Sequence, residues 1–139
     1  MIHIRFLTTD EESIKRLYLE ITEQLQEDLE FAIPPHTYLQ KDCGVFNTLH
    51  YRITIAKKMG AFDKGKKATV VILDGYEPLN EEEFYIYCYS MLAGQDEGYI
   101  LKIEDLANFG GITTLIRYLL QKQELLNYKS QIKKKEFFN

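Results

Sequence analysis

Hydrophobic and polar positions alternate at the start of the chain and then change to a helical period. Residues 2–7 carry large apolar side chains at every second position, which is typical of a β-strand with two different faces. Over residues 10–29 the apolar positions recur at helical spacing, and acidic side chains occupy the opposite face. Thr8, Thr9 and Asp10 supply oxygens that can cap a helix N-terminus. The pattern therefore predicts a strand followed by an amphipathic helix over residues 10–29.

The middle of the chain predicts two further strands. Residues 49–56 alternate between apolar and polar side chains, as expected for a strand with one polar face. Residues 68–73 form an apolar run rich in β-branched side chains, which favours a central, fully buried strand. Asp74 and Gly75 then provide a turn signal. We expect residues 57–67, between the two strands, to form a hairpin-like connection.

Two segments do not fit a single pattern. Residues 34–47 begin with two prolines and are predicted to be irregular, although such a stretch could contain a short strand. Residues 80–93 have the aromatic and β-branched content of a strand. However, Asn80 as an N-cap, Glu83 three residues later and Gly94 as a stop signal favour a helix there, which we predict.

The C-terminal third predicts a short strand over residues 99–103 and a helix over residues 112–126. Residues 129–139 form a basic tail that we expect to be frayed or disordered. The whole pattern predicts one α+β domain over residues 1–128. We expect a mostly antiparallel sheet of three to five strands, packed against about three helices.

Composition supports this class. The chain has 139 residues, of which 45% are hydrophobic and 27% are charged, as in folded globular domains. Its two cysteines, Cys43 and Cys88, are far apart and form no CxxC motif, so small buried thiols are favoured over a disulfide. No run approaches the roughly 18 apolar residues that a transmembrane helix needs. We therefore expect a cytoplasmic protein that does not contact a membrane.

Charge is distributed unevenly along the chain. The net charge is −4, but residues 57–67 hold five lysines and one aspartate and therefore sum to +4. Such asymmetry points to binding partners rather than to a fold. We predict that two patches form an interaction surface. They are the lysine segment, comprising Lys57, Lys58, Lys64, Lys66 and Lys67, and the acidic face of the first helix, comprising Glu20, Glu23 and Glu27.

Nucleic-acid binding is the second hypothesis. The lysine segment could contact phosphates, and residues 105–119 place Ala107 and Gly111 where a helix-turn-helix motif has a small residue and a turn glycine. Arg117 stands where that motif requires a buried aliphatic side chain, so two packed helices at a Gly-Gly corner explain the pattern more simply. The second helix of such a motif would present Thr113, Thr114, Arg117 and Gln121.

An enzyme centred on residues 34–50 is the third hypothesis. Cys43 with His36 or His50 could form a nucleophile and its base, but the sequence indicates no third, orienting group. As metal ligands these three residues have unusual spacing and no evident fourth donor. The chain also contains no phosphate-binding glycine motif. We predict no catalytic residue, no metal and no cofactor.

These observations favour a small, non-enzymatic interaction or regulatory protein of the adaptor, inhibitor, immunity or chaperone kind. Because the lysine segment and the acidic face are complementary in charge, we expect the protein to associate with itself or with a protein partner.

Overall fold

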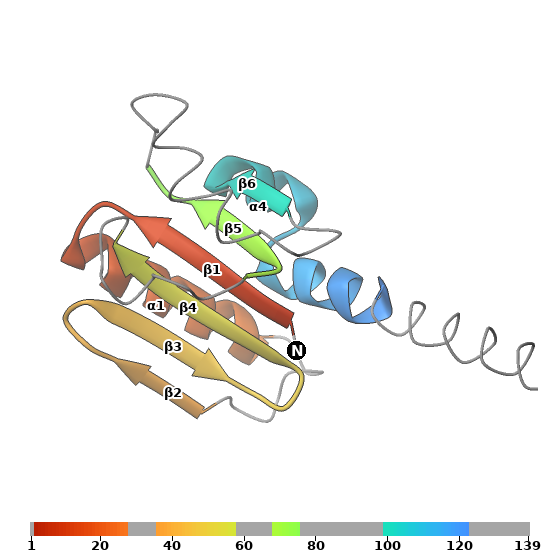
Figure 1. The fold of residues 1–139 in the computed structure, drawn as a ribbon, viewed down its shortest axis with the longest axis horizontal. Coiled ribbons are helices and arrows are strands. Elements are labelled where there is room, and N and C mark those ends of the chain that lie inside the picture. The colour runs from red at the N-terminus through yellow and green to blue at the C-terminus, as the bar shows by residue number, and fades with distance from the viewer. Residues whose placement is uncertain (1, 28–35, 58–67, 76–98, 123–139) are drawn as a thin grey trace, which may run out of the picture.

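Six strands form one mixed sheet in the computed structural model, which describes residues 2–27, 36–57, 68–75 and 99–122 (Figure 1). The strands are β1 (Ile2–Thr8), β2 (His36–Leu39), β3 (Cys43–Asn47), β4 (Tyr51–Lys57), β5 (Val70–Leu73) and β6 (Tyr99–Lys102). The described helices are α1 (Glu11–Glu27), α4 (Ile103–Phe109) and a helix that begins at residue 112 and is described to residue 122.

The sheet has the strand order β2-β3-β4-β1-β5-β6. The first strand, β1, lies inside the sheet and pairs in parallel with β4 on one side and with β5 on the other, and β5 pairs in parallel with β6. Among the described strands, the pairs β2–β3 and β3–β4 are antiparallel. The α+β class is therefore confirmed. The prediction of a mostly antiparallel sheet of three to five strands is wrong, because periodicity reveals strands but not their neighbours or directions.

The segment predicted to be irregular, residues 34–47, contains β2 and β3. These strands form an antiparallel hairpin that Gln40 closes by donating its backbone N–H to the carbonyl of Cys43 at 2.8 Å. The sequence signal was weak because β2 is only four residues long and shows no alternation of burial. The short strand that the sequence left open is therefore present, together with a second one.

The lysine segment does not connect the strands of a hairpin. Its flanking strands, β4 and β5, run in the same direction and are separated by β1, so the chain must cross from one end of the sheet to the other. The predicted hairpin-like connection is therefore wrong. Of its lysines only Lys57, the last residue of β4, lies among the described residues. The predicted helix over residues 80–93, Cys88 and the tail over residues 129–139 also lie outside them.

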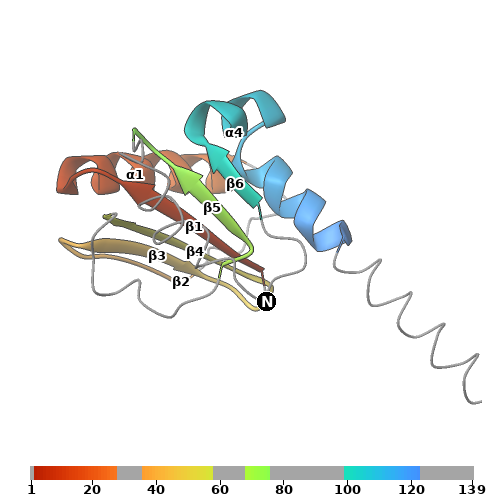
Figure 2. The same ribbon diagram turned by 45° about the horizontal axis from the view of Figure 1, so that its top comes forward.

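The core lies between one face of the sheet and the helices. Helix α1 covers this face of the sheet (Figure 2). Alternate residues of β1 and β4 belong to the core together with the apolar stripe of α1, as the helical spacing of residues 10–29 predicted. The helix that starts at residue 112 adds Ile112, Ile116 and neighbouring apolar side chains to the same core. Each such fully buried side chain contributes about 1.5–3 kcal/mol. The opposite face of β1 and β4 carries polar side chains instead, including Arg5 and Thr54.

Three glycines shape the packing of the helices, one in the sheet and two between helices. At Gly44 in β3, an added Cβ would lie 3.2 Å from Cδ2 of Tyr18, so the absence of a side chain lets α1 approach the strand closely. At the end of α4, Gly110 and Gly111 have φ values of 112° and 92°, a left-handed region that glycine enters at little cost. This corner ends α4 and starts the next helix, as the Gly-Gly pair predicted.

Candidate functional site

The carboxyl ends of β1 and β5 form the best-defined polar site of the described residues. The chain leaving β1 leads towards the β4 side of the sheet, whereas the chain leaving β5 leads to β6 on the other side. Neighbouring parallel strands whose connections diverge in this way form a topological switch point, where α/β sheets commonly place functional groups. Thr8 ends β1 and Asp74 directly follows β5, so both stand at this position.

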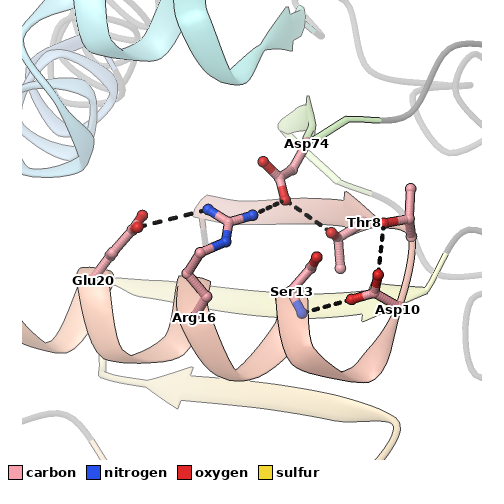
Figure 3. Close-up of polar contacts among 7 residues, drawn as sticks. Thr8, Asp10, Ser13, Arg16, Glu20 and Asp74 are labelled. Carbon is pink, nitrogen blue, oxygen red and sulfur yellow. Dashed lines mark hydrogen bonds and ion pairs between the residues drawn. The ribbon is translucent and has the colours of Figure 1, made fainter.

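Asp74 is the centre of this site (Figure 3). Its Oδ2 accepts a hydrogen bond from the hydroxyl of Thr8 at 2.9 Å and another from Nη2 of Arg16 at 2.6 Å. Thr8 is completely buried, and the Asp74 side chain is 9% exposed. Arg16 also approaches Glu20, with Nη1 3.6 Å from Oε1. These contacts join β1, β5 and α1, and we call Thr8, Arg16 and Asp74 the strand-end cluster.

The start of α1 lies beside this cluster and is capped by Asp10. The Oδ1 atom of Asp10 accepts the backbone N–H of Ser13 at 2.8 Å, which satisfies one of the free donors of the first turn. This hydrogen bond from Ser13 is the main reason why the pKa of Asp10 lies below its usual value. The sequence prediction of a capped helix start is therefore confirmed. The carboxylate of Asp10 also places a negative charge at the positive end of the helix dipole, which is favourable.

Sequence reasoning missed the strand-end cluster. Asp74 was interpreted as part of a turn, and Thr8 as one of several capping residues. A usable signal exists, because an aspartate directly after a buried apolar run stands at the carboxyl end of a predicted central strand. The partners of Asp74 could not be predicted from the sequence, because Arg16 and Thr8 are 58 and 66 residues away from it along the chain.

The structure places the acidic face of α1 on the outside of the helix. Glu20, Glu23 and Glu27 are all exposed, and Leu19 beside them is 57% exposed, although it is a large apolar side chain. Lys57 lies at the carboxyl end of β4, where its Nζ is 3.8 Å from a carboxylate oxygen of Asp42. Lys58, Lys64, Lys66 and Lys67 are outside the described residues, so the lysine segment as a surface stays a prediction.

The geometry does not bring together the cysteine and histidines of the third hypothesis. His36 pairs with Asn47, four residues along β3 from Cys43, which corresponds to about 13 Å. His50 follows the end of β3 that is remote from Cys43. Cys43 itself is buried, and its Sγ lies 3.9 Å from Oε1 of Gln40. Neither histidine is therefore placed to act as a base for this thiol.

The helix pair around Gly110 offers little to nucleic acid. The exposed first turn of α4 carries Glu104 and Asp105, whose charges would repel phosphates. Thr114 is engaged within its own helix, since its hydroxyl donates to the carbonyl of Gly110 at 3.1 Å. Ala107 is exposed rather than packed between two helices. The simpler explanation, two packed helices at a glycine corner, agrees better with these contacts.

The described residues contain neither a metal-binding cluster nor a membrane-spanning helix. No group of three or more histidine, cysteine or acidic side chains within them is arranged to hold a metal ion. No helix in the described part of the chain is long and apolar enough to cross a membrane.

Comparisons with known proteins leave the family open. No protein-family model and no curated protein matches the sequence. Among solved structures, the chain is similar to the large terminase of a thermophilic bacteriophage, with 6% sequence identity and a TM-score of 0.44. The match covers 73% of this chain and 24% of the terminase chain. A likeness of this size supports no inference about fold or activity.

Proposed function

We propose that this protein works by binding other proteins, in an adaptor, inhibitor, immunity or chaperone role, and that it associates with itself. The observation that supports this proposal is the acidic face of α1. Glu20, Glu23 and Glu27 recur at helical spacing on the exposed side of the helix, so they are neighbours that repel one another. Arg16 approaches Glu20 at 3.6 Å, but it is held more closely by Asp74 at 2.6 Å, so it offsets this repulsion only in part. A basic partner would relieve this repulsion.

Leu19 adds an apolar contact to this charged face. Protein interfaces commonly combine a hydrophobic anchor with a polar rim, and an exposed leucine among carboxylates has this composition. Leu19 and Glu23 are four residues apart, which places them next to each other on the helix surface. The partner expected from this chemistry is a surface with several lysines or arginines around an apolar side chain.

The lysine segment makes a second copy of the chain a suitable partner. Its sequence carries five lysines and one aspartate, which complements the acidic face. In a two-fold dimer the same contact would occur twice, so its contribution to the free energy of association would be doubled. Contacts of this kind are screened by salt, and the self-association should weaken as ionic strength rises.

Light scattering during size-exclusion chromatography tests this proposal. We expect the wild-type protein to form an oligomer at low salt. The triple variant Glu20→Lys, Glu23→Lys and Glu27→Lys should be monomeric, as should a variant with all five lysines of the segment changed to glutamate. Mixing the two variants should restore association, because each supplies the charge that the other now needs. Glu104→Lys, a change at an exposed glutamate on α4, serves as the control and should leave the oligomer intact.

Two results would contradict the proposal. One is a wild-type protein that stays monomeric at low salt and captures no protein from an extract of its own cells. The other is an oligomer that is unchanged in both charge-reversal variants while circular dichroism shows that they are folded. A restored heterodimer in the mixing experiment would identify the acidic face and the lysine segment as the two halves of one contact.

A further inference from the structure

The sheet has a second set of buried apolar side chains, on the side opposite the core. The strand register places Leu7 of β1 beside Leu73 of β5, with both side chains away from the core. Six apolar residues on this side are at most 5% exposed without belonging to the core: Leu7, Cys43, Val45, Ala56, Val71 and Leu73. We call these six residues the second face.

No helix among the described residues covers the second face. The described helices contribute their apolar side chains to the core on the other side, through Leu17 of α1, Leu106 of α4 and Ile116 of the helix that begins at residue 112. In Figure 1, α1 lies behind the strands β1 and β4. Because the second face is buried all the same, its cover has to come from a part of the chain outside the described residues.

The order of the strands indicates which connection crosses this side of the sheet. The chain from β1 to β4 carries α1 on the core side and moves towards the β2 edge. The chain from β5 to β6 also joins parallel strands, but it moves in the opposite direction. Connections between parallel strands are almost always right-handed, so two connections that move in opposite directions lie on opposite sides of a sheet. We therefore expect the connection between β5 and β6 to cross the second face.

Residues 80–93, within this connection, have the apolar stripe that the second face requires. As a helix they would place five side chains on one side: Phe84, Tyr87, Cys88, Met91 and Leu92. A helix of these 14 residues would be about 21 Å long, which matches the roughly 23 Å of a seven-residue strand such as β1. The connection between β4 and β5 moves in the same direction, but its residues 58–67 include four lysines and offer little apolar surface.

We propose that residues 80–93 form an amphipathic helix whose apolar stripe packs on the second face. Such a helix returns the chain from the carboxyl end of β5 to the start of β6, as the parallel pairing of these strands requires. The sheet is then covered by helices on both sides, and the second face is an internal contact rather than a docking surface for another protein. This proposal is independent of the acidic face and the lysine segment, because neither takes part in the contact.

Methyl nuclear magnetic resonance of the full-length protein tests the contact directly. In a sample with labelled leucine, valine and aromatic side chains, we expect nuclear Overhauser effects between the methyl groups of Leu7 or Val71 and the ring protons of Phe84 or Tyr87. Val70, whose side chain belongs to the core, is the internal control and should show no such effect. The proposal fails if neither Leu7 nor Val71 shows an effect to any residue of the segment 80–93.

Phe84→Ala and Tyr89→Ala form a matched pair of variants. Both remove an aromatic ring from the segment, but helical spacing places Phe84 within the apolar stripe and Tyr89 on the other side. Phe84→Ala should lower the urea midpoint by about 1 M or more, because the loss of a buried ring leaves a cavity. Tyr89→Ala should change the midpoint by no more than about 0.3 M. Equal shifts in the two variants would contradict the proposal.

Alkylation of wild-type Cys88 gives an answer even if Phe84→Ala does not fold. As a member of the apolar stripe, this thiol should react with iodoacetamide slowly in the folded protein and rapidly in urea. A fast reaction of Cys88 in the folded protein would overturn the proposal.

Discussion

Replacing Asp74 with alanine should lower the free energy of unfolding by about 2–4 kcal/mol. The change removes the acceptor of two hydrogen bonds, from Thr8 at 2.9 Å and from Arg16 at 2.6 Å. The Thr8 hydroxyl is completely buried, and a buried donor without its acceptor costs about 1–3 kcal/mol. The Arg16 side chain is 48% exposed, so solvent screening limits the ion pair to about 1 kcal/mol.

Two further variants separate these contributions. Asp74→Asn retains an oxygen acceptor for Thr8 but removes the charge that attracts Arg16, so it should cost about 1 kcal/mol. Glu20→Gln removes the second carboxylate near Arg16, at 3.6 Å, where both side chains are about half exposed. That change should cost at most about 0.5 kcal/mol, which makes it the matched control for loss of a carboxylate near the same arginine.

Urea denaturation followed by circular dichroism measures these differences from the transition midpoint and slope. In a chain of this length the alanine variant should also melt about 10 °C lower. A double-mutant cycle with Arg16→Gln should give a positive coupling energy with Asp74 and almost none with Glu20. The reasoning would be refuted if Asp74→Ala were within about 0.5 kcal/mol of the wild type, or no more destabilising than Glu20→Gln.

Three further predictions follow from the local contacts. Asp10 has a pKa below its usual 3.8, so its contribution to stability should be complete above that pH and be lost as the pH falls further. Acid titration should show this loss in the wild type and not in Asp10→Asn, which keeps a capping oxygen without a charge. Gly44→Val should destabilise the protein by about 1–3 kcal/mol in urea denaturation, because its side chain would collide with Tyr18. Cys43 is buried, so iodoacetamide should modify it slowly in the folded protein and rapidly in urea, and a fast native reaction would revive the nucleophile hypothesis.

Several elements of this fold could be predicted from short stretches of sequence. The alternation over residues 2–7 and the helical spacing over residues 10–29 were sufficient to predict β1 and α1, because one buried face imposes its period on the sequence. The β-branched run before Asp74 similarly identified a central buried strand, and the Gly110–Gly111 pair identified a helix corner. In each case the information lies within a few neighbouring residues.

Strand pairing was decided only in the tertiary structure. An apolar run fits equally well beside a parallel or an antiparallel neighbour, so nothing in residues 68–73 shows that β5 pairs with β1 rather than with β4. That choice places Asp74 against Thr8 and puts it within reach of Arg16. It also makes the connection through the lysine segment a crossover.

The candidate sites depend on the same long-range choice. The acidic face of α1 was predictable because its glutamates recur within a single helix. The strand-end cluster was not, because it joins Thr8 of β1 and Arg16 of α1 with Asp74, which is far from both in sequence. In this chain the sequence alone was sufficient to predict β1, α1, β4 and β5, but not β2 and β3. The tertiary structure decided which polar side chains meet, since pairing depends on closing long loops, for which local periodicity carries no signal.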